Sequence, residues 1–329
     1  MVVAKNIKYS DDNLTFELDN KSNDFKISLC NAIRRILLSE IETYCLDEEK
    51  IEFVENNSIL NNEFLKHRLS LIPFICDKNY EYEKLVIRCM ANNDSENIKS
   101  IYVNDFEIYD ETTETKLNIK NYLKYPNILF TKIQNNQYFS FEARFSKGIS
   151  FKNGSKHCPV SSCVVTFKKD ENKIKEVTKT MSENDKKSFN LLENQKLFKK
   201  NKLGHPEIYE FNIESIGFYD GKTLIKKAID ILNEKLNEAK DKFTEIEFKD
   251  NFYELRMNEC NDTIGNLVSS YLQDIDEVSY SGYLIEHPLK NEVLLKLKTS
   301  LSKKNLIDKI NSKIKEINNL LNKIKKDFN

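Results

Sequence analysis

Apolar residues recur along the chain with two spacings, which predict both helices and strands. Spacings of three and four residues, typical of a helix with one apolar face, occur at 25–41, 61–71, 224–239, 262–272 and 306–328. Strand-like apolar runs, several of them alternating with polar residues, occur at 14–18, 51–53, 85–87, 101–103, 106–108, 139–145, 164–165, 208–216, 246–248, 252–257, 278–280 and 293–297, with a turn at 249–251. Together these segments predict an α+β fold.

One helical phrase occurs near each end of the chain. Residues 30–38 read CNAIRRILL and residues 265–273 read GNLVSSYLQ, aligned on Asn31 and Asn266. Each copy is followed by strand patterns and then by a long amphipathic helix. The repeat predicts two pseudo-symmetric halves in one chain, which pair through like faces. Each apolar stripe could instead pack only on its own sheet, but its width favours a paired-helix interface. The predicted interface residues are Ile33, Ile36, Leu37, Leu267, Val268 and Tyr271.

The order of the segments also predicts domain boundaries. Residues 1–75 and 205–242 form a discontinuous first half, and residues 243–329 form the second half. Residues 76–204 form a β-rich inserted domain, because the pattern changes to a series of strands after Pro73 and His205-Pro206 marks a boundary. Within this insertion, residues 168–203 are rich in Lys, Glu and Asn, with only fragments of helical pattern.

Charge and cysteine usage exclude several classes of protein. The 51 basic and 52 acidic residues give a net charge of −1, so no overall field attracts nucleic acid. The seven cysteines are scattered and odd in number. Neither an N-terminal apolar stretch nor a run long enough for a membrane span is present. We therefore expect a reducing intracellular compartment, free thiols and no membrane partner.

No arrangement of residues indicates catalysis or a metal. His157, Cys158 and Cys163 form one loose group, whereas zinc sites usually need two close pairs of ligands. The sequence shows neither a nucleophile in a motif nor a recognisable acid pair. The basic runs at 199–202 and 325–326 have no interleaved aromatic residues, so we interpret them as solvated surface. We expect no metal, no cofactor and no catalytic residue.

Two segments of the first half resemble a known family. Residues 30–40 read CNAIRRILLSE and residues 62–73 read NEFLKHRLSLIP. These runs resemble the alpha-like subunit of DNA-dependent RNA polymerases: bacterial alpha, its archaeal D-type counterpart and the third-largest eukaryotic subunit. The run from Lys147 to Val160, with Lys156, His157 and Pro159, is similar to the signature of the same family's inserted domain.

The second half resembles the small partner subunit of the same enzymes, the archaeal L-type chain and its eukaryotic equivalents. Residues 262–267 read DTIGNL and residues 282–289 read GYLIEHPL. The resemblance therefore implies two subunits fused in one chain, similar to fusions in large DNA viruses of eukaryotes. It implies the cytoplasm (viral factory or virion) for a viral protein, and the nucleus otherwise.

The resemblance implies a function that composition alone does not. It implies a non-catalytic assembly scaffold of a multisubunit DNA-directed RNA polymerase, on which the two largest subunits and a small zinc-type subunit dock. DNA and RNA would be contacted only through the assembled complex. The implied docking residues are Arg34, Arg35, His67, Arg68, Lys156 and Pro159. The alternatives are a nucleic-acid-binding adaptor of a transcription complex and a free-standing enzyme that uses the inserted domain.

Overall fold

The computed structural model describes residues 3–10, 12–76, 80–241, 243–249, 252–287, 289–290 and 292–328. The chain folds into two compact units. The paired-sheet unit comprises Met1–Leu37, Ser162–Ile213 and Lys222–Asn329, and the β-rich unit comprises Leu38–Ser161 and Glu214–Gly221. The fold is α+β, as the sequence predicted.

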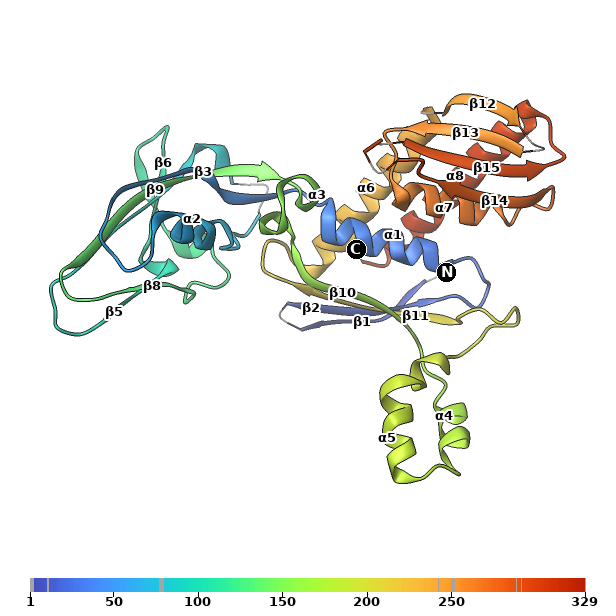
Figure 1. Ribbon diagram of the computed structural model, residues 1–329, viewed down its shortest axis with the longest axis horizontal. Coiled ribbons are helices and arrows are strands. Elements are labelled where there is room, and N and C mark those ends of the chain that lie inside the picture. Colours follow the sequence, from blue (N-terminus) through green and yellow to red (C-terminus); the bar gives the residue numbers. More distant parts are fainter. Residues whose placement is uncertain are drawn as a thin grey trace. The chain divides into compact units, whose positions relative to one another are not determined.

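The paired-sheet unit contains two four-stranded sheets with the same connectivity (Figure 1). The first sheet consists, in spatial order, of β1 (Ala4–Ser10), β2 (Asn13–Asp19), β11 (Ile208–Ser215) and β10 (Val160–Phe167). The second consists of β12 (Phe243–Lys249), β13 (Phe252–Asn258), β15 (Glu292–Thr299) and β14 (Val278–Leu284). In both sheets the fourth strand along the chain therefore lies between the second and the third.

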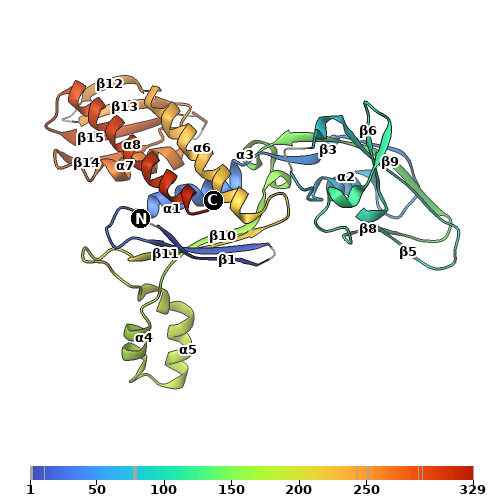
Figure 2. The same ribbon diagram turned by 180° about the vertical axis from the view of Figure 1, so that it is seen from behind.

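The helices repeat in the same way. A short helix follows the second strand of each half, and a long helix follows the fourth. The short helices are α1 (Ile27–Ser39) and α7 (Asp262–Leu272), and the long ones are α6 (Gly221–Asp241) and α8 (Lys303–Lys326). In both ribbon views α1 and the nearby ends of α6 and α8 lie between the two sheets, whereas α7 and the rest of α8 overlap the second sheet (Figures 1 and 2). The observed topology thus repeats in the way that the duplicated phrase predicts.

The first half differs from the second by two long insertions. The β-rich unit is inserted between α1 and β10. A helical hairpin of α4 (Glu171–Thr178) and α5 (Glu183–Leu192) is inserted between β10 and β11. The predicted inserted domain, 76–204, combines parts of both insertions. The compact units instead divide at 37/38 and 161/162, because β10 joins the first sheet and residues 38–75 belong to the β-rich unit.

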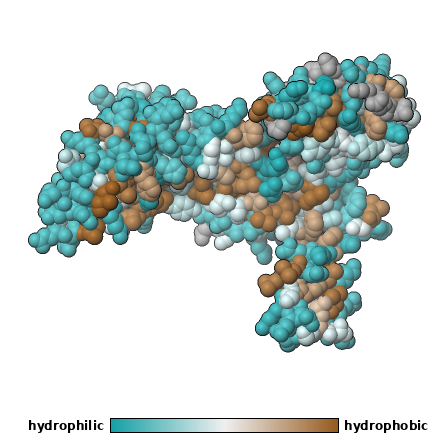
Figure 3. Space-filling view, in the orientation of Figure 1, coloured by the Kyte–Doolittle hydropathy of each residue, from teal (hydrophilic) through white to brown (hydrophobic). Residues whose placement is uncertain are grey.

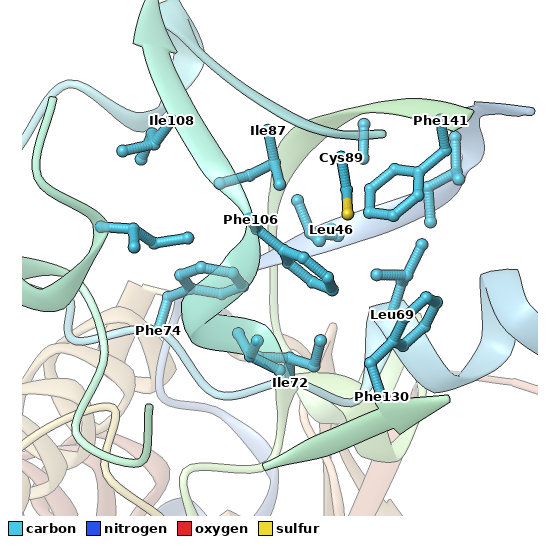
Figure 4. Packing of buried hydrophobic residues seen from close by; sticks show 14 of the residues in the cluster. Leu46, Leu69, Ile72, Phe74, Ile87, Cys89, Phe106, Ile108, Phe130 and Phe141 are labelled. Carbon is cyan, nitrogen blue, oxygen red and sulfur yellow. The ribbon is translucent and has the colours of Figure 1, made fainter. Parts of the chain in front are cut away.

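The β-rich unit is built around one aromatic core. Its main sheet has the order β3 (Thr43–Asn56), β9 (Gln137–Gly148), β4 (Leu85–Asn93), β6 (Glu107–Asp110) and β7 (Thr115–Leu117), beside the pair β5 (Lys99–Tyr102) and β8 (Leu129–Ile133). Its helices are α2 (Asn62–Ser70) and α3 (Ser150–Asn153). The rings of Phe106, Phe130 and Phe141 meet edge to face in the core (Figure 4).

Short 3₁₀ turns complete the fold at Tyr82–Lys84, Val103–Asp105, Ile119–Asn121, Ser155–His157 and Asn194–Lys196. One of them corrects the interpretation of the sequence. Val103 was expected to continue a strand, but the strand ends at Tyr102. The Asp105 carboxylate accepts a hydrogen bond from the Tyr102 N–H at 2.7 Å, which caps the turn.

Strand β1 and the close approach at Gly265 are two features of the paired-sheet unit that the spacing of apolar residues does not predict. Strand β1 has one buried residue, Ala4, and is held by backbone pairing with β2. Of the predicted turn at 249–251, Asp250 and Asn251 lie outside the described residues. Gly265 allows α7 to approach its sheet closely. A Cβ atom there would lie 2.8 Å from atoms of both Tyr283 and Val293.

Candidate assembly interface

Helices α1 and α7 are joined at both ends by polar contacts. Just before α1, the Lys26 ammonium donates to the Ser270 carbonyl and to the Asp274 carboxylate, both at 2.6 Å. Near the other end of α1, the Arg35 Nε donates to the Thr263 hydroxyl at 2.8 Å. The start of one helix therefore meets the end of the other, so the two helices run antiparallel.

The long helices α6 and α8 are also antiparallel, and amide side chains mark their register. Asn233 Nδ2 donates to Asn322 Oδ1 at 3.2 Å, and Asn318 Nδ2 donates to Asn237 Oδ1 at 2.9 Å. An ion pair between Lys325 and Asp230 continues the series. Each step forward along α6 is matched by an equal step back along α8.

The residues that follow α8 contact the start of β1 and the core of the first sheet. The Asp327 carboxylate accepts hydrogen bonds from the N–H groups of Val3 at 2.7 Å and Ala4 at 2.8 Å. Phe328 is 1% exposed, and its ring meets that of Phe16 edge to face at 5.0 Å. Residues at the far end of the second half therefore complete the core of the first half.

The predicted interface residues all lie in the interior of the paired-sheet unit. Each is at most 4% exposed: Ile33, Ile36, Leu37, Leu267, Val268 and Tyr271. The Tyr271 hydroxyl donates to the Asp24 carbonyl at 3.0 Å, and burial raises the pKa of this phenol. This hydroxyl keeps a partner in the other half, so the burial of its polar end is compensated.

The two arginines of α1 have different surroundings. Arg34 is partly exposed, and its Nε donates to Asn31 Oδ1 at 2.9 Å on the same helix. Arg35 is exposed, but its Nε is used in the contact with Thr263. The contact of Arg34 thus stays within its own helix, whereas the contact of Arg35 joins the two halves.

His67 and Arg68 are neighbours on α2 in the β-rich unit, with different environments. His67 is exposed. Arg68 donates from Nε to the Phe130 carbonyl and from a terminal nitrogen to the Leu129 carbonyl, both at 2.9 Å. The Arg68 side chain thus fastens α2 to β8.

The run from Lys147 to Val160 contains a buried polar cluster. His157 is 1% exposed, and its Nδ1 lies 3.0 Å from the Thr43 hydroxyl oxygen. Burial, followed by the nearby Lys156, lowers the pKa of this imidazole. A Cβ atom on Gly148 would lie 2.8 Å from His157 Nε2, so only glycine leaves room for the ring.

Lys156 and Pro159 belong to the same run. The Lys156 ammonium lies 3.8 Å from the Asp47 carboxylate, and its side chain is 19% exposed. Pro159 is buried, and its carbonyl accepts from the Ile216 N–H at 3.2 Å. Of these two residues, only Lys156 has exposed side-chain surface for a partner.

The described residues contain no group of three or more His, Cys, Asp and Glu side chains placed to hold a metal ion. Burial raises the pKa of the Cys45, Cys89 and Cys163 thiols to about 12. These thiols stay protonated near neutral pH, so they are poor nucleophiles and poor metal ligands. No helix among the described residues is long and apolar enough to cross a membrane.

Sequence reasoning missed the polar residues that join the two halves. It did not identify Lys26, Thr263 and Asp274, because only the tertiary arrangement brings them together. A signal was present for the amide pairs, since α6 and α8 each carry two asparagines four residues apart on one face. Nothing in the sequence singled out Asp327.

Family models match both halves of the chain. A model described as the RNA polymerase Rpb3/Rpb11 dimerisation domain matches residues 21–236. A second model with the same description matches residues 253–327. The matched ranges include α1, α7, α8 and most of α6, the helices that make the contacts between the halves.

Individual relatives agree with these matches. The chain is 24% identical over 303 residues to "DNA-directed RNA polymerases II, IV and V subunit 3" of Arabidopsis thaliana, covering 74% of this chain and 92% of that protein. It is 28% identical over 204 residues to "DNA-directed RNA polymerase II subunit rpb3" of Dictyostelium discoideum, covering 54% and 63%. It is 41% identical over 73 residues to "DNA-directed RNA polymerase subunit Rpo3" of Pyrococcus horikoshii, covering 22% and 26%.

Proposed function

The chain belongs to the RNA polymerase Rpb3/Rpb11 dimerisation-domain family, and from this we propose that it is the assembly scaffold of a multisubunit DNA-directed RNA polymerase. In this proposal its two halves form an intramolecular alpha-type dimer. The two largest subunits and a small zinc-type subunit dock on that platform. The chain itself performs no catalysis, and the reacting groups belong to other chains.

The observation that carries the proposal is the repeated topology with its polar contacts between halves. Two sheets of identical strand order contribute one short and one long helix each. The short helices are joined through Lys26 and Arg35, and the long helices through their asparagines. Such reciprocal use of equivalent elements is what an isologous dimer interface requires.

Fusion gives this scaffold a kinetic and thermodynamic advantage. A covalent link makes the pairing of the halves intramolecular, with an effective concentration of around millimolar for a short linker. Helix α6 ends at Asp241 and β12 begins at Phe243, so very little chain separates the halves. One folded chain then presents a preformed platform, and assembly begins at the docking of the large subunits.

We assign docking to the charged positions that remain exposed. Arg34 and Arg35 on α1, His67 on α2 and the partly exposed Lys156 remain candidates. Arginine suits such a role because its planar fork can hold a carboxylate or two carbonyl groups. Arg68 and Pro159 position neighbouring backbone in this proposal and do not touch the partner.

Purification of the tagged chain from its native cells tests the proposal. Mass spectrometry of the co-purifying proteins should identify two large polymerase subunits in equal molar amounts with this chain. The purified complex should polymerise RNA on a DNA template, whereas the recombinant chain alone should not. A chain that purifies without polymerase subunits would refute the scaffold function.

A further inference from the structure

The hairpin of α4 and α5 extends the first half at a place where the second half has only a short loop. Residues 168–207 connect β10 to β11, whereas residues 285–291 connect the equivalent strands β14 and β15. The base of the hairpin is fixed to the sheet, since the Lys168 N–H donates to the Ile208 carbonyl at 3.1 Å. The two helices lie side by side in both ribbon views (Figures 1 and 2).

Both helices of the hairpin have a side-chain N-cap, but neither has a buried side chain. The Asp170 carboxylate accepts from the Lys173 N–H at 3.2 Å, and the Ser182 hydroxyl accepts from the Asp185 N–H at 3.3 Å. Neither helix contains a buried residue, although both are amphipathic. Helices this short are marginal in water without packing of their apolar face. The hairpin therefore lacks the packing that would stabilise it.

Apolar side chains of the hairpin face solvent. Leu191 is 78% exposed, Leu192 is 76% exposed and Val177 is 40% exposed. Figure 3 shows apolar surface gathered over this part of the molecule. Contiguous exposed apolar surface is typical of a binding site, whereas apolar residues that are exposed singly are common on any protein.

The charge of the hairpin selects the kind of partner. Residues 168–203 contain eleven lysines and six acidic residues, in a chain that is almost neutral as a whole. The acidic residues Asp170, Glu183 and Glu193 are paired with lysines three residues away. Outside these pairs, seven exposed lysines remain in 168–203, against three exposed acidic residues, Glu171, Glu176 and Asp185. This excess of positive charge, to which Lys175, Lys179 and Lys187 contribute, attracts an acidic surface.

We propose that the α4–α5 hairpin docks an acidic amphipathic helix of another protein chain. Resting on the proposed function, this inference makes the hairpin an additional attachment point on the assembled polymerase. Leucines at helical spacing in the partner would cover Leu191 and Leu192, and its flanking carboxylates would face the exposed lysines. A second copy of this chain does not fit, because two lysine-rich hairpins repel each other.

Nucleic acid also fits the hairpin poorly. Binding of single strands uses exposed aromatic rings on which bases stack. The Phe198 ring near the hairpin base packs against Phe167 at 5.0 Å, and Lys200 lies over it. Phe189 on α5 is only partly exposed. Two neighbouring leucines offer apolar surface with no stacking face.

Binding of a defined probe to the full-length chain tests the inference directly. The probe is a fluorescein-labelled 20-residue peptide with leucines at helical spacing and glutamates elsewhere. Fluorescence anisotropy should show saturable binding that Leu191→Asn/Leu192→Asn weakens at least about tenfold. Leu289→Asn, which changes a 90% exposed leucine in the second half, is the matched control and should bind normally. A peptide with lysines in place of the glutamates should not bind.

Three outcomes of this titration would overturn the proposal. They are absence of saturable binding, equal binding of the lysine peptide, and equal binding by the double leucine variant. A 20-nucleotide single strand of DNA is titrated in parallel. Binding of the DNA without binding of the acidic peptide would identify the hairpin as a nucleic-acid contact instead.

Hydrogen exchange on the purified polymerase complex separates this proposal from the scaffold function. Amides of α4 and α5 should exchange at least about tenfold more slowly in the complex than in the free chain, before and after nuclease treatment. If the large subunits are present but these amides are unprotected, the hairpin proposal fails and the scaffold function stands. If the large subunits are absent, the scaffold function fails, and the peptide titration still decides the hairpin.

Discussion

The two halves of the paired-sheet unit use equivalent helices in different ways. At inward positions the helices α1 and α7 carry similar apolar residues, such as Ile33 with Val268 and Leu37 with Leu272, and all are buried. At the next positions α1 carries Arg34 and Arg35, whereas α7 carries Ser269 and Ser270. Ser269 is buried and Ser270 is partly exposed. The two helices therefore share their apolar inward residues, but at these two aligned positions only the first half carries charge.

The halves also differ in what they add to the shared unit. Both insertions interrupt the first half, and the second half keeps short connections throughout. The second half instead supplies the end of α8, whose Asp327 and Phe328 complete the first sheet. The first half therefore carries both insertions, and the second half contributes to the core under the first sheet.

Placing a charge in the shared interior should give the largest effect. Ile36 is fully buried, so Ile36→Asp leaves an unpaired carboxylate or a costly neutral acid between the halves. We expect the free energy of unfolding to fall by several kcal/mol, on the order of 3 to 5. Urea denaturation measures it. Ile27→Asp on the same helix, at a 47% exposed position, should change stability by only about 0.5 kcal/mol. Similar losses for both variants would contradict the paired interior.

Gly265 in α7 aligns with Cys30 in α1, so only the second half has a glycine at this position of the repeat. Gly265→Ala would place a methyl group against Tyr283 and Val293 at 2.8 Å, so the free energy of unfolding should fall by about 1 to 3 kcal/mol. Gly265→Ser should cost at least as much, because its side chain is larger. Thermal and urea unfolding measure both variants. A neutral Gly265→Ala would mean that α7 can move away from its sheet without loss.

Fold class and the inward helix residues could be predicted because apolar periodicity records burial directly. Ile33 and Leu267 show this, since each falls on the predicted stripe and is at most 1% exposed. The Arg68 and Pro159 environments could not be predicted. Their roles depend on carbonyl and amide groups of segments far along the chain, such as Phe130 and Ile216. Strand β1 was not predicted either, because its backbone pairing with β2 requires no pattern of side chains.

The contact at the end of α8 predicts a smaller loss. Asp327→Ala removes a charged acceptor from two backbone N–H groups near the start of β1. Unfolding should become easier by about 1 to 2 kcal/mol, since such charge-assisted bonds contribute that much and water can replace part of the interaction. Asp308→Ala, at an exposed position of the same helix, should be nearly neutral. Equal stability of the two variants would remove the proposed role of the second half in closing the first sheet.

The β-rich unit, which the second half lacks, should add a pH dependence of its own. The pKa of His157 lies below the ordinary value of 6.5 in the folded chain, so the unfolded chain binds the extra proton first. The free energy of unfolding should therefore decrease as the pH falls below about 6.5, at up to about 1.4 kcal/mol per pH unit for one proton. Urea denaturation between pH 5 and 8 measures the slope. His157→Gln should reduce it, and His67→Gln, at an exposed position, should not.

Arg34→Glu should have the smallest effect on stability among these variants and the largest effect on assembly. Arg34 is partly exposed and bonded only locally to Asn31, so Arg34→Glu should change the free energy of unfolding by about 0.5 kcal/mol or less. Arg35→Glu should cost about 1 kcal/mol more, because it also removes the hydrogen bond to Thr263. If α1 faces a large subunit, Arg34→Glu places an unmatched charge in that contact, which costs several kcal/mol of binding.

Co-purification with the large subunits then distinguishes docking from simple solvation. The Arg34→Glu chain should unfold like the parent chain yet recover little of either large subunit. Ser270→Glu, which adds a carboxylate at a partly exposed position of α7, is the comparison in the second half, because Ser269, the residue aligned with Arg34, is buried. Full assembly by both variants would mean that Arg34 is an ordinary solvated charge. Loss of assembly by both variants would mean that α7 also contacts a large subunit. The two halves would then differ only in the insertions that the first half carries.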